Sequence, residues 1–379
     1  MHAQRRPIRV VHLVEALGVG GMENGVVNLA NHFDYELFGF TVCCFSEAGL
    51  LAGRIVHPQA SVITLGYGGG RHTTAVFRLA ALLRRLDADV LHTHGWGSRS
   101  LLGFAAAKLA RVSRCVNGEH GVLHLDKAHR LALQRFMAPR FDGTLSVSEA
   151  LKQKLVSRLN VAPRHITVIP NGVDTSRFNG AYPRVLKRQE LGLPAEAQVV
   201  AVIGSLKKEK NQQVALDAVA VMAGEGRPVS LLLVGDGADR GLLEAQARNL
   251  GVTPYVRFLG NRADVAELLP AIDVVALCSV PDHEGMSNTL LEAMASGVPV
   301  VTSDSVGARE VVDDGRTGLL FDYRDPRDLA SKLRWLLDDD VRRQTIVENA
   351  RRVVRLSFSI GAMVGRYQDY YSGLFDGQT

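Results

Sequence analysis

The sequence contains no apolar run of the roughly 18 residues that a membrane-spanning helix requires, so no such helix is expected. It begins Met-His-Ala-Gln-Arg-Arg-Pro and leads directly into the strand-like stretch Ile8–Val14, so we expect no signal peptide. Cysteine is scarce, and Cys43, Cys44, Cys115 and Cys278 form no Cys-x-x-Cys pair. All four lie in or beside apolar segments. This pattern favours buried free thiols in a reducing compartment over a disulfide framework.

Recognised nucleic-acid-binding motifs are also lacking, although the net charge is +5 at pH 7. The charge is uneven, because residues 1–180 carry 21 basic and 12 acidic side chains while the remainder carries 23 and 27. A basic first half suits anionic lipid headgroups or a polyanionic ligand, and a solvated basic face with no partner is the alternative. Without a motif, nucleic acid is not an expected partner.

A chain of 379 residues is longer than one compact core usually supports, so two domains are expected. The composition, 46% hydrophobic and 22% charged, supplies enough apolar side chains for two cores. We place an N-terminal domain at residues 1–175 and a C-terminal domain at residues 184–357. The amphipathic, aromatic segment 360–379 is expected to form a helix that packs back on the first domain.

Short apolar runs alternate with helical periodicity in both parts of the chain. Strands are predicted at 8–14, 40–45, 61–65, 90–94, 114–118, 143–147 and 166–169, and again at 199–203, 230–234, 256–259, 274–277 and 298–302. Buried strands that alternate with helices are typical of a parallel sheet covered on both faces. The expected fold class is α/β, with two doubly wound Rossmann-like domains that face each other across a ligand-binding cleft.

The segment Asp282–Gly297 follows the last but one of these strands and opens a helix. A helix N-terminus offers unpaired N–H groups and a partial positive charge, which favours phosphate. Glu284 precedes this helix and Glu292 lies about one turn inside it, so two carboxylates can face different parts of one ligand. The alternative is that Glu284 offsets the helix dipole and Glu292 is an exposed helix residue.

Glu284 and Glu292, together with the sequence Glu-Ala-Met-Ala-Ser-Gly-Val-Pro-Val-Val that begins at Glu292, resemble the signature of family 4 retaining glycosyltransferases of the GT-B fold. Other segments agree in the family's order over nearly the whole chain: 18–21, 92–94, 118–121, 147–148, 169–174, 208–211, 234–237 and 258–260. The segments 23–25 and 118–121 also resemble a subset linked to bacterial exopolysaccharide and exosortase systems.

The resemblance implies a metal-independent, retaining hexosyltransferase. It would move a sugar from a UDP- or GDP-linked donor to a glycan, such as a lipid-linked glycan or a polysaccharide precursor, with no cofactor. The expected location is the cytoplasm, at the inner face of the membrane. The basic helical stretch Leu123–Arg140 would supply a peripheral contact with anionic lipid. Two alternatives stay open: a GT-B nucleotide-sugar epimerase, and a nucleotide-sugar-binding scaffold of weak or no activity.

The resemblance also implies roles for individual residues on the second domain. Glu292 would bind the donor ribose, and Glu284 would contact hydroxyls of the donor sugar. Lys210 would pair with the diphosphate, as a compact cation should. Backbone amides of Gly285, Met286, Ser287, Asn288 and Thr289 would hold the sugar and the distal phosphate. Asn261 and Arg262 would lie near the base.

On the first domain, Gly20 and Gly21 would let the backbone approach the phosphates without an intervening side chain. His120 is the best catalytic candidate, since it follows a predicted strand and the resemblance places a histidine here near the anomeric carbon of the donor. The alternative is a structural histidine. His92 and His94 alternate on the preceding strand, and one of them is expected to support the site from behind.

One position departs from the family pattern. The family usually has Gly-Arg where this chain has Gly204 and Ser205, and that arginine assists the lysine in neutralising the diphosphate. Ser205 cannot supply a charge, and we hypothesise that Lys207 or Lys208 compensates. This departure is the reason for keeping the scaffold alternative.

Metal and dinucleotide sites are disfavoured. A zinc site at His92, His94, His120 and His124 would lack the cysteine or carboxylate ligands usual for zinc. The Asp-x-Asp pair at 87–89 precedes a strand and therefore lies at the wrong end of it for the ligand. A dinucleotide fingerprint would need glycine where Glu23 stands.

Overall fold

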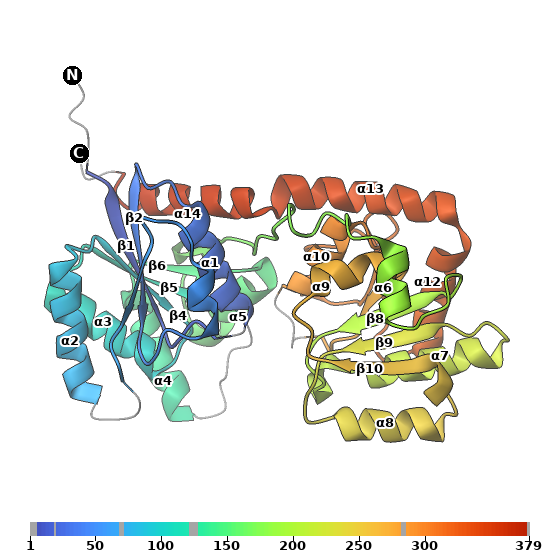
Figure 1. Ribbon diagram of the computed structural model, residues 1–379. Coiled ribbons are helices and arrows are strands. Elements are labelled where there is room, and N and C mark those ends of the chain that lie inside the picture. Colours follow the sequence, from blue (N-terminus) through green and yellow to red (C-terminus); the bar gives the residue numbers. More distant parts are fainter. Residues whose placement is uncertain (1–5, 19, 68–71, 121–127, 282–285, 377–379) are drawn as a thin grey trace. The chain divides into compact units, whose positions relative to one another are not determined.

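The computed structural model describes residues 6–18, 20–67, 72–120, 128–281 and 286–376. The chain divides into two compact units, unit 1 (residues 1–172 and 360–379) and unit 2 (residues 173–359). Each is an α/β unit built on a parallel sheet, which confirms the expected fold class (Figure 1). Residues 173–175, which we placed in the N-terminal domain, and residues 176–183, which we placed between the domains, fall within unit 2 in this division.

The sheet of unit 1 has, within the described residues, the strand order β3-β2-β1-β4-β5-β6-β7. The strands are β1 (Ile8–Val14), β2 (Phe38–Cys44), β3 (Ser61–Thr64), β4 (Val90–His94), β5 (Arg114–Glu119), β6 (Gly143–Ser146) and β7 (Ile166–Val168). All neighbouring pairs are parallel, and the register sets His12 beside His92 and His94 beside Gly118. The carboxyl ends of β1, β4 and β5 therefore share one edge.

Helices cover both faces of this sheet. They are α1 (Gly21–His32), α2 (His72–Arg85), α3 (Ser98–Ala110), α4 (Ala128–Met137), α5 (Glu149–Leu159) and α14 (Ile360–Gly373), with short 3-10 turns η1 (Leu50–Arg54), η2 (Ala138–Arg140) and η3 (Pro163–His165). Side chains alternate along β1, so Val10 and Val14 pack with α1 and α14, whereas Val11 and Leu13 pack with α2, α3 and α5. Figure 1 shows α2 and α3 side by side.

The sheet of unit 2 has the strand order β10-β9-β8-β11-β12-β13 in the described part of the chain. Its strands are β8 (Val199–Ile203), β9 (Ser230–Val234), β10 (Val256–Gly260), β11 (Val274–Leu277), β12 (Val300–Ser303) and β13 (Leu319–Phe321). All neighbouring pairs are again parallel, so their carboxyl ends form one edge. The sequence did not predict β13, whose three residues are too few for a periodic pattern.

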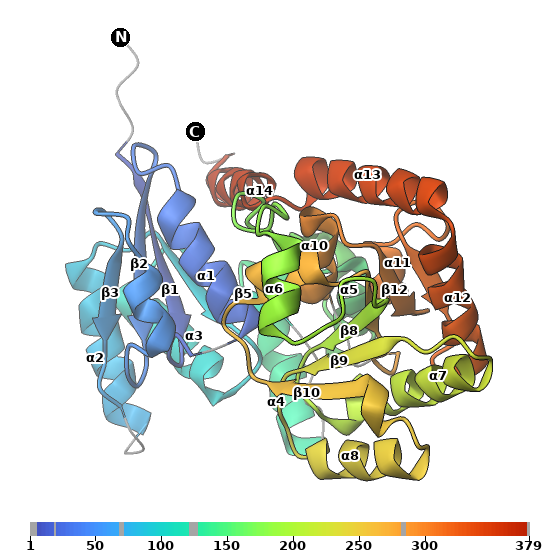
Figure 2. The same cartoon turned by 45° about the vertical axis from the view of Figure 1, so that its right-hand side comes forward.

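The helices of unit 2 are α6 (Arg184–Glu190), α7 (Gln213–Gly224), α8 (Arg240–Asn249), α9 (Val265–Leu268), α10 (Asn288–Ser296), α11 (Val306–Arg309), α12 (Pro326–Asp338) and α13 (Asp340–Ser357), with 3-10 turns η4 (Lys208–Lys210), η5 (Thr253–Tyr255) and η6 (Leu269–Ala271). One face of the sheet packs on α7, α8 and α12, and helix α10 packs beside β11 and β12. Figure 2 shows α7 beside α12, and α8 along the edge strand β10.

Two expectations from composition can be compared with the structure. The four cysteines are free and buried, as predicted. In the described ranges, every helix is too short or too polar to cross a membrane.

Candidate active site

At the carboxyl edge of the sheet in unit 2, backbone hydrogen bonds join the ends of neighbouring strands and the segments that follow them. The amide of Gly204 donates to the carbonyl of Val234 at 2.8 Å, and the amide of Gly235 donates to the carbonyl of Gly260 at 2.8 Å. Gly235 has φ 134°, and a Cβ there would collide with the carbonyl of Gly204. Only glycine therefore fits this close approach, which brings the segments after β8, β9 and β10 together.

Lys210 ends the 3-10 turn η4, directly after β8. The carbonyl of the preceding residue, Glu209, accepts a 2.9 Å hydrogen bond from the amide of Val280, which follows β11. This bond fixes the turn that carries Lys210 against the segment that leads toward α10. The carbonyl of Ser205 accepts a 2.9 Å bond from the Gln212 side chain, and Lys207 and Lys208 are exposed.

The start of α10 lies at the same edge. Ser287 is the N-cap residue and, among described contacts, its side chain makes no capping hydrogen bond. Met286 and Ser287 are buried, while Asn288 and Thr289 are partly exposed. Glu284 and Gly285, which were predicted to contact the donor sugar, lie outside the described residues.

Glu292 lies one turn inside α10 and is largely buried. Burial raises the pKa of its carboxyl to about 7, and the positive charge of Arg177 partly opposes this shift. Arg177 also donates a 3.3 Å hydrogen bond to the carbonyl of Ala263, beyond β10. Arg177 was not among the residues predicted from the sequence. It stands three residues after the Asn-Gly-Val-Asp segment 171–174, which was the only signal available.

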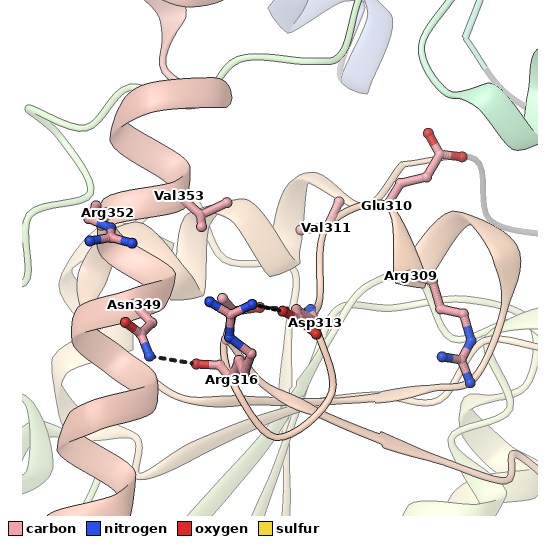
Figure 3. Close-up of a pocket in the computed structure, with 9 residues that line it drawn as sticks. Arg309, Glu310, Val311, Asp313, Arg316, Asn349, Arg352 and Val353 are labelled. Carbon is pink, nitrogen blue, oxygen red and sulfur yellow. Dashed lines mark hydrogen bonds and ion pairs between the residues drawn. The ribbon is translucent and has the colours of Figure 1, made fainter.

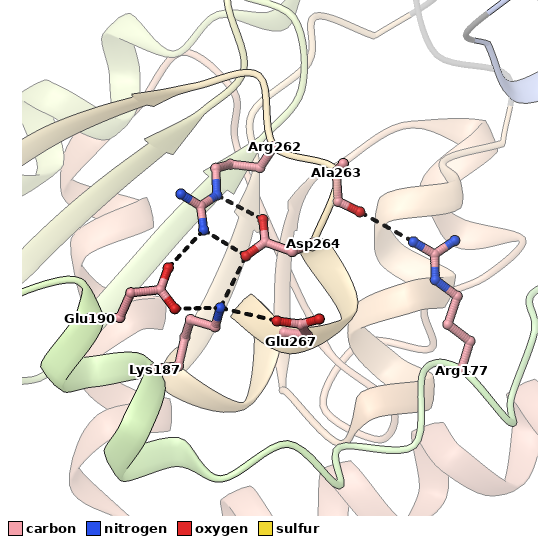
Figure 4. Close-up of polar contacts among 7 residues, drawn as sticks. All are labelled: Arg177, Lys187, Glu190, Arg262, Ala263, Asp264 and Glu267. Carbon is pink, nitrogen blue, oxygen red and sulfur yellow. Dashed lines mark hydrogen bonds and ion pairs between the residues drawn. The ribbon is translucent and has the colours of Figure 1, made fainter. Parts of the chain in front are cut away.

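Arg262 follows β10 and is bound by carboxylates. Its guanidinium donates to both oxygens of Asp264 at 2.7 and 2.6 Å and to Glu190 at 3.1 Å (Figure 4). The nearly fully buried ammonium of Lys187 binds Glu190, Asp264 and Glu267 at 2.7, 3.0 and 3.2 Å. The hydrogen bond from Arg262 holds the pKa of Asp264 at about 2. The cluster joins α6 to α9, while Asn261 is exposed at the loop.

In unit 1, Gly20 is the N-cap residue of α1 and Gly21 its first residue. The Glu23 carboxylate lies over Gly20, at the place where a Cβ would otherwise be. The carbonyl of Gly20 accepts hydrogen bonds from the amide and the side chain of Asn24 at 3.1 and 2.8 Å. An acidic side chain thus occupies the helix end that was predicted to approach phosphate.

His120 follows β5 and is the outer end of a hydrogen-bonded network, which we call the histidine network and which consists of His120, His94, His12, Tyr371 and His92. His120 Nε2 is 2.8 Å from His94 Nδ1, and His94 Nε2 is 3.0 Å from His12 Nδ1. His12 Nε2 is 3.0 Å from the Tyr371 hydroxyl, which is 2.6 Å from His92 Nδ1. Burial lowers the pKa of all four imidazoles, that of His120 to about 4, so they are neutral at pH 7.

Comparison with known proteins then decides the family. Residues 19–177 match the family described as "Glycosyltransferase Family 4", and residues 184–353 match "Glycosyl transferases group 1". The chain is 35% identical over 360 residues to the D-inositol 3-phosphate glycosyltransferase of Corynebacterium jeikeium, with 85% of each chain covered. The chain belongs to glycosyltransferase family 4.

A second relative and a solved structure resemble this chain to different extents. The D-inositol 3-phosphate glycosyltransferase of Corynebacterium kroppenstedtii is 34% identical over 293 residues, an alignment that covers 71% of this chain and 64%, less than two thirds, of that relative. HepE from Anabaena, solved in complex with UDP, has a TM-score of 0.82 and 25% identity, with 97% of this chain and 100% of HepE covered. These likenesses confirm the family and the GT-B fold.

A metal centre was not predicted for this family member, and three of the histidines stand close enough to raise the question. One ligand atom from each of His12, His92 and His94 lies within 4.8 Å of the others. His94 is stacked on both other rings, with 15° between the planes of His92 and His94 and 26° between those of His12 and His94, and the planes of His12 and His92 are tilted by 36°. His12 Nδ1 and His94 Nε2 already share a hydrogen bond of 3.0 Å, and His92 Nδ1 is 2.6 Å from the Tyr371 hydroxyl, so the geometry suits a hydrogen-bond network better than a zinc site.

The Asp-x-Asp pair at 87–89 binds arginines. Asp89 accepts hydrogen bonds from Arg6 at 2.9 and 2.8 Å and from the amide of Arg9 at 3.0 Å, and Asp87 pairs with Arg9 at 2.6 Å. These carboxylates precede β4, at the opposite end of the strand from His94. They fasten the start of β1 to the turn between α2 and β4.

A pocket of about 210 Å³ in unit 2 involves none of the predicted residues (Figure 3). It lies between the segment 309–317 and helix α13. Arg316 pairs with Asp313 at 2.9 Å, and its carbonyl accepts a 3.2 Å bond from Asn349. Arg309 binds Asp304, so two of the arginines that line this pocket are already neutralised.

His12 and Tyr371 are the members of the histidine network that sequence analysis missed. A signal for His12 existed, because β1 and β4 are adjacent central strands and each carries a buried histidine near its end. Tyr371 had only a weak signal, its i, i+4 spacing from Tyr367 on one face of the C-terminal helix. Both tyrosines are buried in the core of unit 1.

Proposed function

We propose that the chain is a retaining, metal-independent hexosyltransferase that transfers a sugar from a UDP- or GDP-linked donor to a glycan acceptor. The observation that carries this proposal is the carboxyl edge of unit 2. There Lys210, the start of α10 and the partly buried Glu292 follow β8 and β11. A cation, a helix N-terminus and a carboxylate suit a diphosphate joined to a ribose.

The donor roles follow from this chemistry. Glu292 would accept hydrogen bonds from ribose hydroxyls, and Glu284 would contact the donor sugar. Amides at 285–289 would hold the sugar and the distal phosphate. HepE, which has a similar fold, was solved in complex with UDP. This favours a uridine-linked donor for the present chain. Arg262 is bound by carboxylates, so Asn261 is the better candidate for a contact with the base.

The charges at this edge favour a reaction that needs no metal ion. The diphosphate charge would be offset by the Lys210 ammonium together with the positive end of the α10 dipole. Ser205 gives no charge, so exposed Lys207 and Lys208 of the same loop would add the remaining positive potential. Lys210→Ala should lose most turnover. Lys207→Ala and Lys208→Ala should each lower it, and wild-type rates in both would remove the compensation hypothesis.

Retention would follow if attack and departure occur on the same face of the sugar. The departing phosphate would take the proton of the acceptor hydroxyl, so no side-chain base is required. His120 would position the donor sugar near its anomeric carbon. Closure of the two domains around the substrates would exclude water and align the reacting atoms.

The acceptor is proposed to be a lipid-linked glycan or a polysaccharide precursor, handled in the cytoplasm at the inner face of the membrane. The net charge of +9 over residues 1–180 suits an anionic acceptor. On α4, exposed Leu133 and Phe136 lie beside Arg135, and Arg140 follows in η2, a pattern suited to peripheral contact with anionic lipid. Flotation with acidic liposomes should show binding that weakens with salt, and no binding at low salt would refute this contact.

The test of the proposed function begins with thermal shifts in a panel of UDP- and GDP-sugars, with and without EDTA. The correct donor should raise the melting temperature by mass action, also in EDTA. Release of nucleotide with an acceptor pool would then show transfer, and NMR of the product would show the anomeric configuration. Binding without release favours the scaffold, and conversion of the donor without acceptor favours the epimerase.

A further inference from the structure

Within the described residues, the histidine network is a single unbranched chain of hydrogen bonds. It runs from His120 through His94, His12 and the Tyr371 hydroxyl to His92. A neutral imidazole has one N–H and one bare nitrogen, and a phenol has one O–H. Each member can therefore donate to one neighbour and accept from the other. The Tyr371 hydroxyl could also accept from both neighbours, but its own O–H would then have no acceptor, because His12 and His92 are its only partners among the described residues. Two proton orders therefore satisfy every member of the chain, and they run in opposite directions.

In the first order, His120 Nε2–H donates inward, and each member donates to the next until the Tyr371 hydroxyl donates to His92 Nδ1. The proton of His92 is then on Nε2. In the second order, His92 Nδ1–H donates to the Tyr371 hydroxyl, and the donation runs outward until His94 Nδ1–H donates to His120 Nε2. The proton of His120 is then on Nδ1.

The surroundings of His92 Nε2 decide between these orders. This atom is fully buried and has no hydrogen-bond partner in the described ranges. It faces the Cα of Gly118, since a Cβ built on Gly118 would lie 2.7 Å from it. A buried N–H aimed at a C–H group would be an unsatisfied donor, which is rare in proteins. A bare nitrogen instead receives a weak Cα–H contact.

We propose that the buried end of this chain, Tyr371 and His92, fixes His120 as the tautomer protonated on Nδ1. His94 and Tyr371 are then positioning residues. They supply a donor to His120 Nε2 and prevent that nitrogen from taking a proton from substrate. His120 therefore acts on the substrate as a hydrogen-bond donor through Nδ1 and not as a general base.

The catalytic role of the tautomer rests on the proposed function, whereas the tautomer itself does not. This role agrees with a reaction in which the departing phosphate takes the acceptor proton, since no base is then needed from His120. The tautomer itself is a property of the protein without substrate. It can therefore be measured whether or not a donor sugar has been found.

The chain offers a matched pair of variants. Tyr371→Phe removes the hydroxyl that bridges His12 and His92. Tyr370→Phe removes a neighbouring buried hydroxyl that has no hydrogen-bond partner among the described residues. Both lose one oxygen from the same helix, so a general effect of the lost atom would appear in both.

The experiment is a long-range ¹H–¹⁵N correlation spectrum of the full chain labelled with ¹⁵N-histidine, in which protonated and bare imidazole nitrogens have well separated shifts. The His120 signals are assigned by their loss in His120→Gln. Wild type and Tyr370→Phe should show His120 protonated on Nδ1 alone, and Tyr371→Phe should show a mixture of tautomers. If transfer is found, kcat of Tyr371→Phe should fall about tenfold with KM for the donor nearly unchanged.

A wild-type His120 protonated on Nε2 would overturn the proposal, as would a Tyr371→Phe spectrum identical to that of wild type. If Tyr371→Phe fails to fold, a wild-type measurement still decides. The ¹⁵N–¹⁵N scalar coupling across the hydrogen bond should join His94 Nδ1–H to a bare His120 Nε2. A coupling in which His120 carries the shared proton refutes the outward order, and an inactive protein with the expected coupling refutes only the proposed function.

Discussion

Replacing Glu292 by glutamine should stabilise unit 2 relative to wild type at pH 8, and much less at pH 5. Glu292 is largely buried on α10, and burial raises its pKa from 4.5 to about 7 despite the nearby charge of Arg177. The folded protein therefore holds this proton more tightly than the unfolded chain does. Stability is highest below the unfolded pKa and decreases as the pH rises through the window between the two values.

The size of the effect follows from these two pKa values. The interval between 4.5 and about 7 corresponds to about 3 kcal/mol of ionisation cost once both states have lost the proton. Between pH 5 and pH 8 the free energy of unfolding of the wild type should fall by about 2 kcal/mol, because part of the ionisation cost is already present at pH 5. Glutamine cannot ionise, so Glu292→Gln should not show this loss.

The two tryptophans permit a selective assay, because Trp96 lies in unit 1 and Trp335 in unit 2. In a Trp96→Phe background, fluorescence of Trp335 during urea unfolding reports on unit 2. Unfolding curves at pH 5 and pH 8 give the free energy of unfolding for Glu292 and for Glu292→Gln. A difference between the two proteins that stays constant across pH would refute the reasoning.

Two further outcomes are expected. Gly118→Ala places a Cβ 2.7 Å from His92 Nε2 and should lower the free energy of unfolding by about 1–3 kcal/mol, measured by urea unfolding, whereas Gly25→Ala, with no atom within 4 Å, should be neutral or stabilising. Asp264→Asn should cost about 1–2 kcal/mol at pH 7, after allowance for solvent screening. Because Arg262 holds the pKa of Asp264 at about 2, the cost should shrink as the pH falls toward 3, and an equal loss at both pH values would contradict the ion-pair explanation.

Sequence patterns predicted the sheets well because buried parallel strands are short, continuous apolar runs. The strands Ile8–Val14, Val90–His94 and Val199–Ile203 have the predicted bounds. Helix α13 was not predicted, although it is 18 residues long. Its buried residues are Ile346, Ala350 and Val354, which form one narrow apolar stripe. So few apolar positions give little helical periodicity in the sequence.

The candidate site could be predicted only where residues lie close in sequence. The α10 segment and Lys210 were recognisable from local motifs. Tyr371 is far from His12 along the chain, and only the packing of α14 on the sheet brings the two together. Likewise, nothing near Arg262 in sequence indicates that Glu190 binds it.

The packing of α14 in unit 1 has a consequence for biosynthesis. Ile360, Met363, Val364, Tyr367 and Tyr371 complete a core whose other members come from the first 172 residues. While the ribosome is still translating the middle of the chain, the nascent unit 1 lacks these side chains. His12 and His92 then also lack the Tyr371 hydroxyl to which both are hydrogen-bonded. Unit 2 ends before α14 and can fold first, so the unit that starts the chain should be the last to mature.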